Sequence, residues 1–373
     1  MSWDLIIGQQ RVKNLLQGSL ERNHLAHAFL FYGPEGAGQD AVAIELAKIL
    51  NCSAGSVSSC GQCADCLKSV QLQHPNIQLI FPLPVGKSEE AGDLPFAKLT
   101  PADLELVREE MQAKAKNPYH TITIPRATSV KVNSIREIRR SASMNVFSEG
   151  KKVFIVSNAD KMNDEAANAL LKTLEEPLED TYIILTTSNA DQLLPTIVSR
   201  CQRVRFDPLP EEEIRKALID RFNMEPAKAE LLVDISRGNF SIALELLDSD
   251  LTQYRDDVVD FLRTILYRTR EDLFNRIQQI AAEGDRKEVE RSLVLLQAWF
   301  HDAMTAKEGP VSRKHIQENT SLRKFIEIHP SIDYGKVHEA LTEAVSSINK
   351  NVYIPLILIV LSLKLRAIIL TRH

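Results

Sequence analysis

Four closely spaced cysteines are the first residues in this chain whose types could do chemistry. Cys52, Cys60, Cys63 and Cys66 are separated by seven, two and two residues. Thiolates this close in sequence can surround a zinc ion tetrahedrally, and Gly61 eases the tight turn between two of them. Because the chain would supply all four ligands, the zinc that we predict is structural rather than catalytic. Unligated or redox-active thiols are the alternative that the spacing leaves open.

A glycine-rich turn is the second chemical motif. It lies between an apolar run over 28–32, typical of a buried strand, and an apolar pattern over 40–50, typical of a buried helix. Strand, glycine-rich turn and helix in this order form a phosphate cradle, because backbone N–H groups turn inward at the positive end of a helix. Gly33, Gly36 and Gly38 hold the places that such a P-loop needs.

The cradle lacks the side chains that would grip phosphate and magnesium. Gln39 stands where a P-loop has lysine, and Asp40 puts a carboxylate in place of the Ser or Thr that ligates magnesium. Ser157 and Asn158, which follow the strand expected over 151–156, replace the acidic pair that organises magnesium and the attacking water. We therefore predict a degenerate P-loop without ATP hydrolysis or ATP binding, although nucleotide binding without turnover stays open.

Hydrophobic periodicity gives the elements that must position these groups. The expected helices cover 11–21, 40–50, 101–116, 132–143, a segment from 163 to before Pro177, and 193–200, and the expected strands cover 28–32, 122–124, 151–156 and 182–187. Three short helices are expected within 208–248, followed by a nearly all-helical segment that includes 255–268, 285–305 and 334–348. The apolar run 354–363 is interpreted as a buried helix. The stretch 82–125, rich in Pro and Gly, is interpreted as an insertion that is partly helical.

Composition bounds the class of protein. The 373 residues are 44% hydrophobic and 25% charged, as expected for a soluble protein of two or three domains. The net charge of −5 argues against a general nucleic-acid coat. The start of the chain lacks a secretory signal and no apolar run has a spanning length, so we expect a cytoplasmic protein without membrane contact.

Several of these stretches together resemble one family. The segments 27–34, 168–177 and 194–201, combined with the four-cysteine insertion, resemble the AAA+ subunits of the bacterial replicative clamp loader, a part of the DNA polymerase III holoenzyme. The resemblance is strong over about 6–206 and weaker beyond it. The insertion at about 82–125 has no match in the family pattern.

The resemblance implies an α/β fold with three parts. Residues 1–207 would form an AAA+ RecA-like domain with a parallel sheet and the zinc module, residues 208–250 a helical lid, and residues 251–373 an all-α collar for oligomerisation. The implied assembly is a ring-like hetero-oligomer with gamma or tau subunits and a delta subunit. Through it the chain would act on the sliding clamp and primer–template DNA.

The resemblance also assigns roles to two later residues. Arg200, in a Ser-Arg-Cys run, would act in trans as an arginine finger on ATP bound to a neighbouring subunit. The alternative for it is a surface or lid-facing salt bridge. Ser241 stands where hydrolysing relatives carry a sensor arginine, which again favours a subunit that does not hydrolyse ATP.

Two other functions remain in competition. One is an active AAA+ ATPase subunit that uses substitute residues, suggested by the intact glycines. The other is a zinc-containing DNA-binding module, suggested by the cysteines and by Arg136, Arg139 and Arg140, although these arginines are typical of a solvated helix face.

Overall fold

The computed structural model divides the chain into two compact units, 1–247 and 248–373. The structure describes residues 3–55, 57–86, 88–90, 92–143, 150–247, 251–283, 286–308, 320–349 and 352–370. Within the first unit, the separation of a base (1–207) from a lid (208–250) stays a prediction.

The first unit is built on one parallel sheet of five strands in the order β2-β3-β4-β1-β5. The strands are β1 (Ala28–Tyr32), β2 (Ile77–Ile80), β3 (Lys152–Val156), β4 (Thr181–Thr187) and β5 (Gln202–Arg205). The central strands are almost continuously buried, since helices cover both faces of the sheet. This parallel α/β arrangement is the fold class predicted from the sequence.

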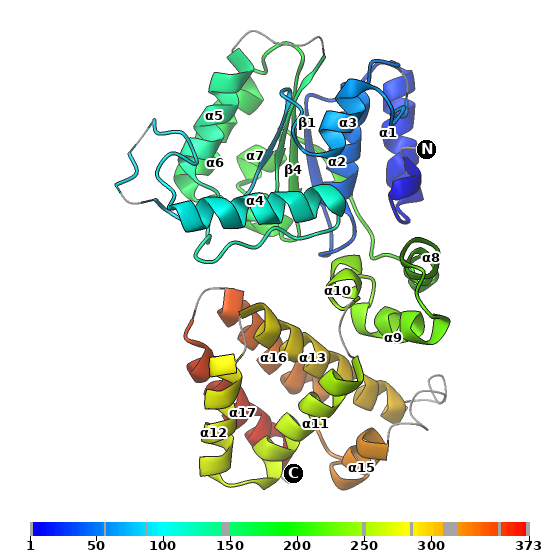
Figure 1. The fold of residues 1–373 in the computed structure, drawn as a ribbon, viewed down its shortest axis with the longest axis vertical. Helices are drawn as coiled ribbons and strands as arrows, with labels where there is room; N and C mark the ends of the chain where they lie inside the picture. The colour runs from blue at the N-terminus through cyan, green and yellow to red at the C-terminus, as the bar shows by residue number, and fades with distance from the viewer. Residues whose placement is uncertain are drawn as a thin grey trace. The chain divides into compact units, whose positions relative to one another are not determined.

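Helices lie on both sides of the sheet (Figure 1). One side carries α1 (Gln10–Glu21), α2 (Gln39–Leu50) and α3 (Ala64–Val70), and the other carries α5 (Val132–Ser143), α6 (Asp164–Glu175) and α7 (Pro195–Val198). Apolar residues of α5, α6 and α7 form one core with the inner strands. Short 3-10 turns cover Trp3–Leu5, Ala159–Lys161 and Ala190–Gln192.

The insertion contains α4 (Pro101–Lys116), which begins where Thr100 caps its first turn. Phe81 and Leu83, just beyond β2, form a separate small core with Val107 of α4 and with Ile124. The insertion is therefore packed against the carboxyl end of the sheet, the edge where open α/β folds place their ligands.

The predicted strand over 122–124 was wrong. These residues belong to no strand of the described structure. The side chain of Ile124 is buried in the small core, and the Thr123 N–H donates to the Glu110 carboxylate at 2.7 Å. Because a side chain satisfies this backbone donor, no partner strand is needed.

Three short helices follow the sheet, as predicted for 208–248. They are α8 (Glu211–Phe222), α9 (Pro226–Ser236) and α10 (Phe240–Glu245). The Asn239 side chain caps α10 by accepting the N–H of Ile242. The Arg221 guanidinium, from α8, donates to the Leu5 carbonyl at 2.6 Å and so ties these helices to the start of the chain.

The second unit is helical throughout its described part. Its helices are α11 (Leu251–Tyr267), α12 (Arg270–Glu283), α13 (Arg286–Glu308), α15 (Thr320–Ile328), α16 (Tyr334–Asn349) and α17 (Ile354–Leu370). Trp299 packs edge-on against Phe325, with ring centroids 4.8 Å apart, and both side chains are buried.

The interpretation of 354–363 as a buried helix needs correction. The run is helical, within α17, but only one face is buried. Leu356, Val360 and Leu363 form an exposed stripe on the other face. Among the described residues, no helix is both long enough and apolar enough to cross a membrane.

Candidate functional site

The glycine-rich loop keeps the backbone of a phosphate cradle. Gly36 and Gly38 have φ of 72° and 98°, in the left-handed region that favours glycine. A Cβ on Gly36 would lie 1.8 Å from Oδ1 of Asn239, the cap of α10. The Phe240 N–H donates to the Gly36 carbonyl at 3.3 Å. The start of α10 therefore sits directly on the loop, and only glycine permits this approach.

Gln39 is buried and turned back onto the loop itself. Its Nε2 donates to the carbonyls of Gly33 at 2.8 Å and Pro34 at 2.9 Å. A P-loop lysine uses this position to reach the β- and γ-phosphates. Here the amide is occupied by the protein's own backbone, and it carries no charge that could attract phosphate.

Asp40 forms an ion pair with Lys114. Lys114 Nζ, only 2% exposed, lies 2.7 Å from Asp40 Oδ2, and the Thr186 hydroxyl donates to Oδ1 at 2.5 Å. Burial alone would raise the pKa of Asp40, but the Lys114 ammonium and the hydrogen bonds outweigh it, so the pKa lies below its usual value. The Asp40 carboxylate therefore stays charged and neutralises the Lys114 ammonium. Because it is already paired in this way, the carboxylate is unsuited to bind the magnesium ion of a nucleotide.

The other residues predicted for the degenerate site gather around the same cavity. Ser157 and Asn158, at the end of β3, line it together with Ser241, whose hydroxyl donates to the Tyr119 carbonyl at 2.7 Å. Also in its lining are Gly36, Gly38, Gln39 and Asp40. Gly33 lies at the base of the loop, where a Cβ would be 2.3 Å from the Phe206 carbonyl. The structure thus brings the predicted residues together.

The cavity itself is small. Its volume is about 70 Å³, whereas small-molecule sites usually occupy about 300–1,000 Å³. Lys114 and Tyr119 of the insertion occupy space beside the loop, and sequence reasoning missed both. One signal existed: a carboxylate at Asp40, inside a buried motif, requires a cationic partner.

Arg200 follows α7 and lies at the surface, with its side chain 35% exposed. Its Nη1 donates to the Thr196 carbonyl at 2.9 Å, and its Nη2 lies 2.8 Å from Oε1 of Glu175. The guanidinium is therefore ordered by its own subunit while it remains accessible. A surface pair of this kind contributes at most about 1 kcal/mol, so another partner could displace Glu175.

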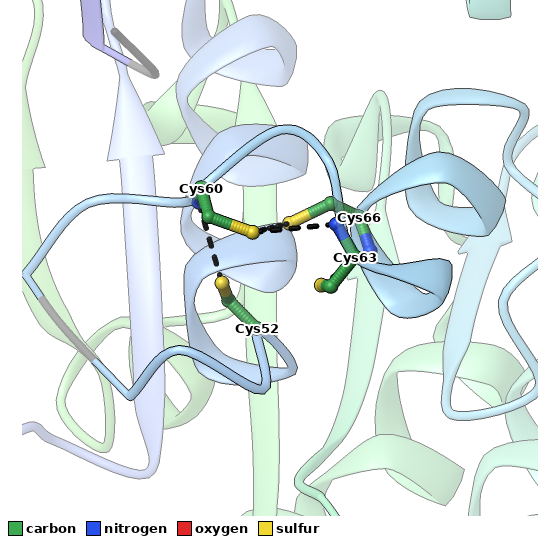
Figure 2. A group of neighbouring side chains, drawn as sticks. All are labelled: Cys52, Cys60, Cys63 and Cys66. Carbon is green, nitrogen blue, oxygen red and sulfur yellow. Dashed lines mark hydrogen bonds between the residues drawn. The ribbon is translucent and has the colours of Figure 1, made fainter.

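The four predicted zinc ligands converge in space. Figure 2 shows the side chains of Cys52, Cys60, Cys63 and Cys66 turned toward one another, and their sulfurs all lie within 4.8 Å of each other. The sulfurs of Cys60 and Cys66 are 3.9 Å apart. Four sulfurs at about 2.3 Å from a tetrahedral zinc would be separated by about 3.8 Å. The residues therefore fit a closed four-thiolate zinc site.

Backbone donors and burial tune these thiols unequally. The N–H groups of Cys60, Cys63 and Cys66 each donate to the sulfur of another cysteine at 3.3–3.4 Å. A hydrogen bond with Ser53 lowers the pKa of Cys63 to about 6, whereas burial raises the pKa of Cys66 to about 12. A zinc ion at the centre would oppose the effect of burial by stabilising the thiolate.

The cysteine loop is anchored to the flank of the sheet. The Ser59 hydroxyl donates to Oε1 of Glu45 on α2 at 3.0 Å, and Glu45 forms a buried ion pair with Lys48 at 2.6 Å. The Trp3 indole donates to the Val57 carbonyl at 3.0 Å. These contacts attach the loop to α2 and to the N-terminal segment at Ser59 and Val57.

The three arginines of α5 are exposed and paired with carboxylates. Arg136 lies 2.8 Å from Glu165, and the other two approach glutamates at 3.9 Å: Arg139 with Glu176 and Arg140 with Glu137. These contacts agree with the solvated helix face that the sequence favoured.

Comparison with known proteins places the chain in a family. Residues 8–210 match the family model described as DNA polymerase III, delta subunit. The chain is 31% identical to DNA polymerase III subunit delta' of Bacillus subtilis over 81% of this chain and 78% of that protein. It is 27% identical to subunit tau of the same organism over 66% of this chain and 37% of that protein. A solved gamma subunit-related protein from Thermotoga maritima covers 95% of this chain and 99% of its own, at 16% identity with a TM-score of 0.43.

Proposed function

The chain belongs to the DNA polymerase III delta-subunit family, with a delta' subunit among its relatives, and from this premise we propose a non-hydrolysing role for it in the clamp loader. It is a clamp-loader subunit that acts in DNA replication. Its proposed task is to scaffold the loader and to supply Arg200 to the ATP site of a neighbouring subunit while the sliding clamp is loaded.

The arrangement at Gln39 and Asp40 carries the non-hydrolysing half of the proposal. Both side chains are held by the protein itself, one on loop carbonyls and the other on Lys114. No lysine remains at this position to hold phosphate, and no Ser or Thr remains to ligate magnesium. Intrinsic ATP turnover would need other residues to supply both functions.

The position of Arg200 supports the trans-acting half. An arginine placed against a γ-phosphate stabilises the charge that develops in the transition state. Arg200 is accessible, and its exposed partner Glu175 is weak enough to be exchanged for a phosphate. Ordering by the Thr196 carbonyl would reduce the entropy lost when the side chain engages.

The remaining roles follow from the two units. The cysteine cluster would hold one structural zinc, and residues 251–373 would form the collar that assembles with gamma or tau and delta subunits. Contact with primer–template DNA would come through the complex, in the cytoplasm.

Purified chain alone tests the proposal against an active ATPase. We expect no phosphate release above the enzyme-free rate and no thermal shift with ATP or ADP in the presence of magnesium. A hydrolysing gamma or tau subunit in the same assay is the positive control. Hydrolysis that co-elutes with the folded, isolated chain would instead establish an active site built from substitute residues.

A further inference from the structure

We propose that the insertion fills the degenerate nucleotide site and clamps α10 against the glycine-rich loop. The segment concerned is 101–122, that is α4 and the loop after it, called the strap below. This assigns a function to the part of the chain that has no counterpart in the family pattern.

The strap enters the site through Lys114. This residue comes from the last turn of α4, yet its side chain is 2% exposed. Its ammonium donates to Asp40 Oδ2 and to the His120 carbonyl, both at 2.7 Å. One buried cation thus joins the first turn of α2 to the strap and fixes the loop that follows α4. A charged side chain this deeply buried is stable only when its counter-charge is present.

Tyr119 continues the contact along the glycine-rich loop. A Cβ added to Gly38 would lie 3.0 Å from Cε1 of its ring, so the ring lies directly beside the loop. The phenol oxygen accepts the N–H of Ile7 at 2.7 Å. Burial raises the pKa of Tyr119 above its usual range, which keeps the phenol neutral. The ring therefore occupies the space next to the loop and also fixes the start of the chain.

The same residue holds α10. The ring of Tyr119 meets Phe240 edge-on, with centroids 5.1 Å apart and an interplanar angle of 81°. Its carbonyl accepts the hydroxyl of Ser241 at 2.7 Å. An arginine at 241 would have to extend into the position of the strap, whereas serine is short enough to bond with it. Serine at 241, where the resemblance implies a sensor arginine in hydrolysing relatives, is therefore compatible with the strap in this position.

The strap consequently links three separate parts of the first unit: the glycine-rich loop, the N-terminal segment and α10. It leaves the cavity of about 70 Å³, whose lining includes Pro118, Tyr119, Thr121 and Ile122 of the strap itself. With the strap in this position, α10 is held against the glycine-rich loop without any nucleotide. This inference rests on the proposed function, in which the chain does not bind nucleotide. It adds that the strap takes the place of the nucleotide.

Hydrogen exchange of the full-length chain tests the strap. Tyr119→Ala removes the ring, Lys114→Met removes the buried cation, and Ser241→Ala removes a single hydrogen bond without opening a large cavity. We expect amides of α10 and of residues 33–38 to exchange at least about tenfold faster in each variant. Lys116→Met, on the exposed side of the same helix, is the matched control and should leave both segments unchanged.

Amides of β3 report whether a variant has lost its fold as a whole. If β3 stays protected and α10 keeps its wild-type protection in Tyr119→Ala and Ser241→Ala, the strap does not clamp α10 and the inference is overturned. If Lys114→Met unfolds the first unit, the exchange rates of Ser241→Ala still show whether the strap clamps α10. Addition of ATP or ADP to wild-type protein tests the proposed function separately. If nucleotide slows the exchange of residues 33–38, both the proposed function and the strap are contradicted. If no nucleotide binds and the variants exchange at the wild-type rate, the strap alone is contradicted.

Discussion

At the scale of single residues, two side chains of the glycine-rich loop are held by the protein itself. Gln39 is an uncharged donor that the loop carbonyls can satisfy, and Asp40 is an anion that Lys114 can neutralise. Both pairings are internal: Gln39 and Lys114 are buried, and the Asp40 side chain is 25% exposed. A mutation at either position is therefore expected to change folding stability rather than ATP turnover.

Asp40→Asn should destabilise the first unit by about 3 kcal/mol, because it leaves the Lys114 ammonium buried without a counter-charge. Urea unfolding of wild-type and variant protein at neutral pH measures the difference. The double variant Asp40→Asn/Lys114→Met should recover most of the loss, since no isolated charge remains. Equal stability of the single variant and wild type would show that the pair does not form.

The stabilising effect of Asp40 should also depend on pH. Its pKa in the folded protein lies below the ordinary value of 3.8, so the ion pair stabilises fully above that value. The advantage is lost as the pH falls toward the folded pKa. The stability difference between wild type and Asp40→Asn should thus be constant from pH 7 to about 5 and shrink below about 4. A difference that grows with acidification would contradict the assignment.

The sequence predicts the site residues more completely than it predicts their partners. Glycine spacing and missing catalytic side chains predict a degenerate loop, because those positions are fixed relative to one strand and one helix. Lys114 is 74 positions from Asp40. Its role depends on how the insertion packs, and no local pattern encodes that packing.

At the scale of elements, short and atypical strands were the hardest to predict. The strand β5, Gln202–Arg205, is mostly exposed and contains two arginines, and it is a strand because its backbone pairs with β1. The strand β2 has four residues, too few for a clear alternation. In contrast, β1, β3 and β4 are apolar runs, and their existence follows from burial on both faces. The strand predicted at 122–124 failed because side-chain contacts replaced a ladder.

The cysteine loop with α3 is an element whose order should depend on metal. Purified protein should contain about one equivalent of zinc, and Cys66→Ser should lose it. We expect this variant to melt at least about 5 °C lower, since a buried ligand is removed from a closed site. Metal analysis and thermal melting measure the two effects.

Cys201→Ser is the matched control for the zinc prediction. This fifth cysteine is buried in the core beside α7, away from the cluster, so its replacement should leave the zinc content unchanged. Metal-free wild-type protein with full stability would contradict a structural zinc.

At the scale of the whole molecule, the proposed roles are distributed between the two units. The first contains the glycine-rich loop that we propose to be a degenerate site, the cysteine cluster and Arg200. The second is a helical unit with an exposed apolar stripe on α17. Leu356, Val360 and Leu363 recur at helical spacing along this stripe, which suits a helix face that packs against other subunits.

Leu363→Asp should leave the isolated chain folded, with stability within about 0.5 kcal/mol, because the side chain is 59% exposed. In a reconstituted loader it should prevent co-purification with gamma or tau and delta subunits. Leu67→Asp, at a leucine of α3 that is 54% exposed, is the control and should assemble normally. Assembly of both variants would exclude the stripe as a collar contact.

The loader reconstituted with Arg200→Ala tests the central claim most directly. ATP hydrolysis at the neighbouring site should fall on the order of 1,000-fold or more, as for other arginine fingers, while assembly stays intact. The hydrolysis rate of the loader with Arg200→Lys should fall nearly as far, because lysine cannot form the bidentate contact. Arg203→Ala, at another exposed arginine, should keep wild-type turnover. ATPase and clamp-loading rates of Arg200→Ala equal to wild type would contradict the account.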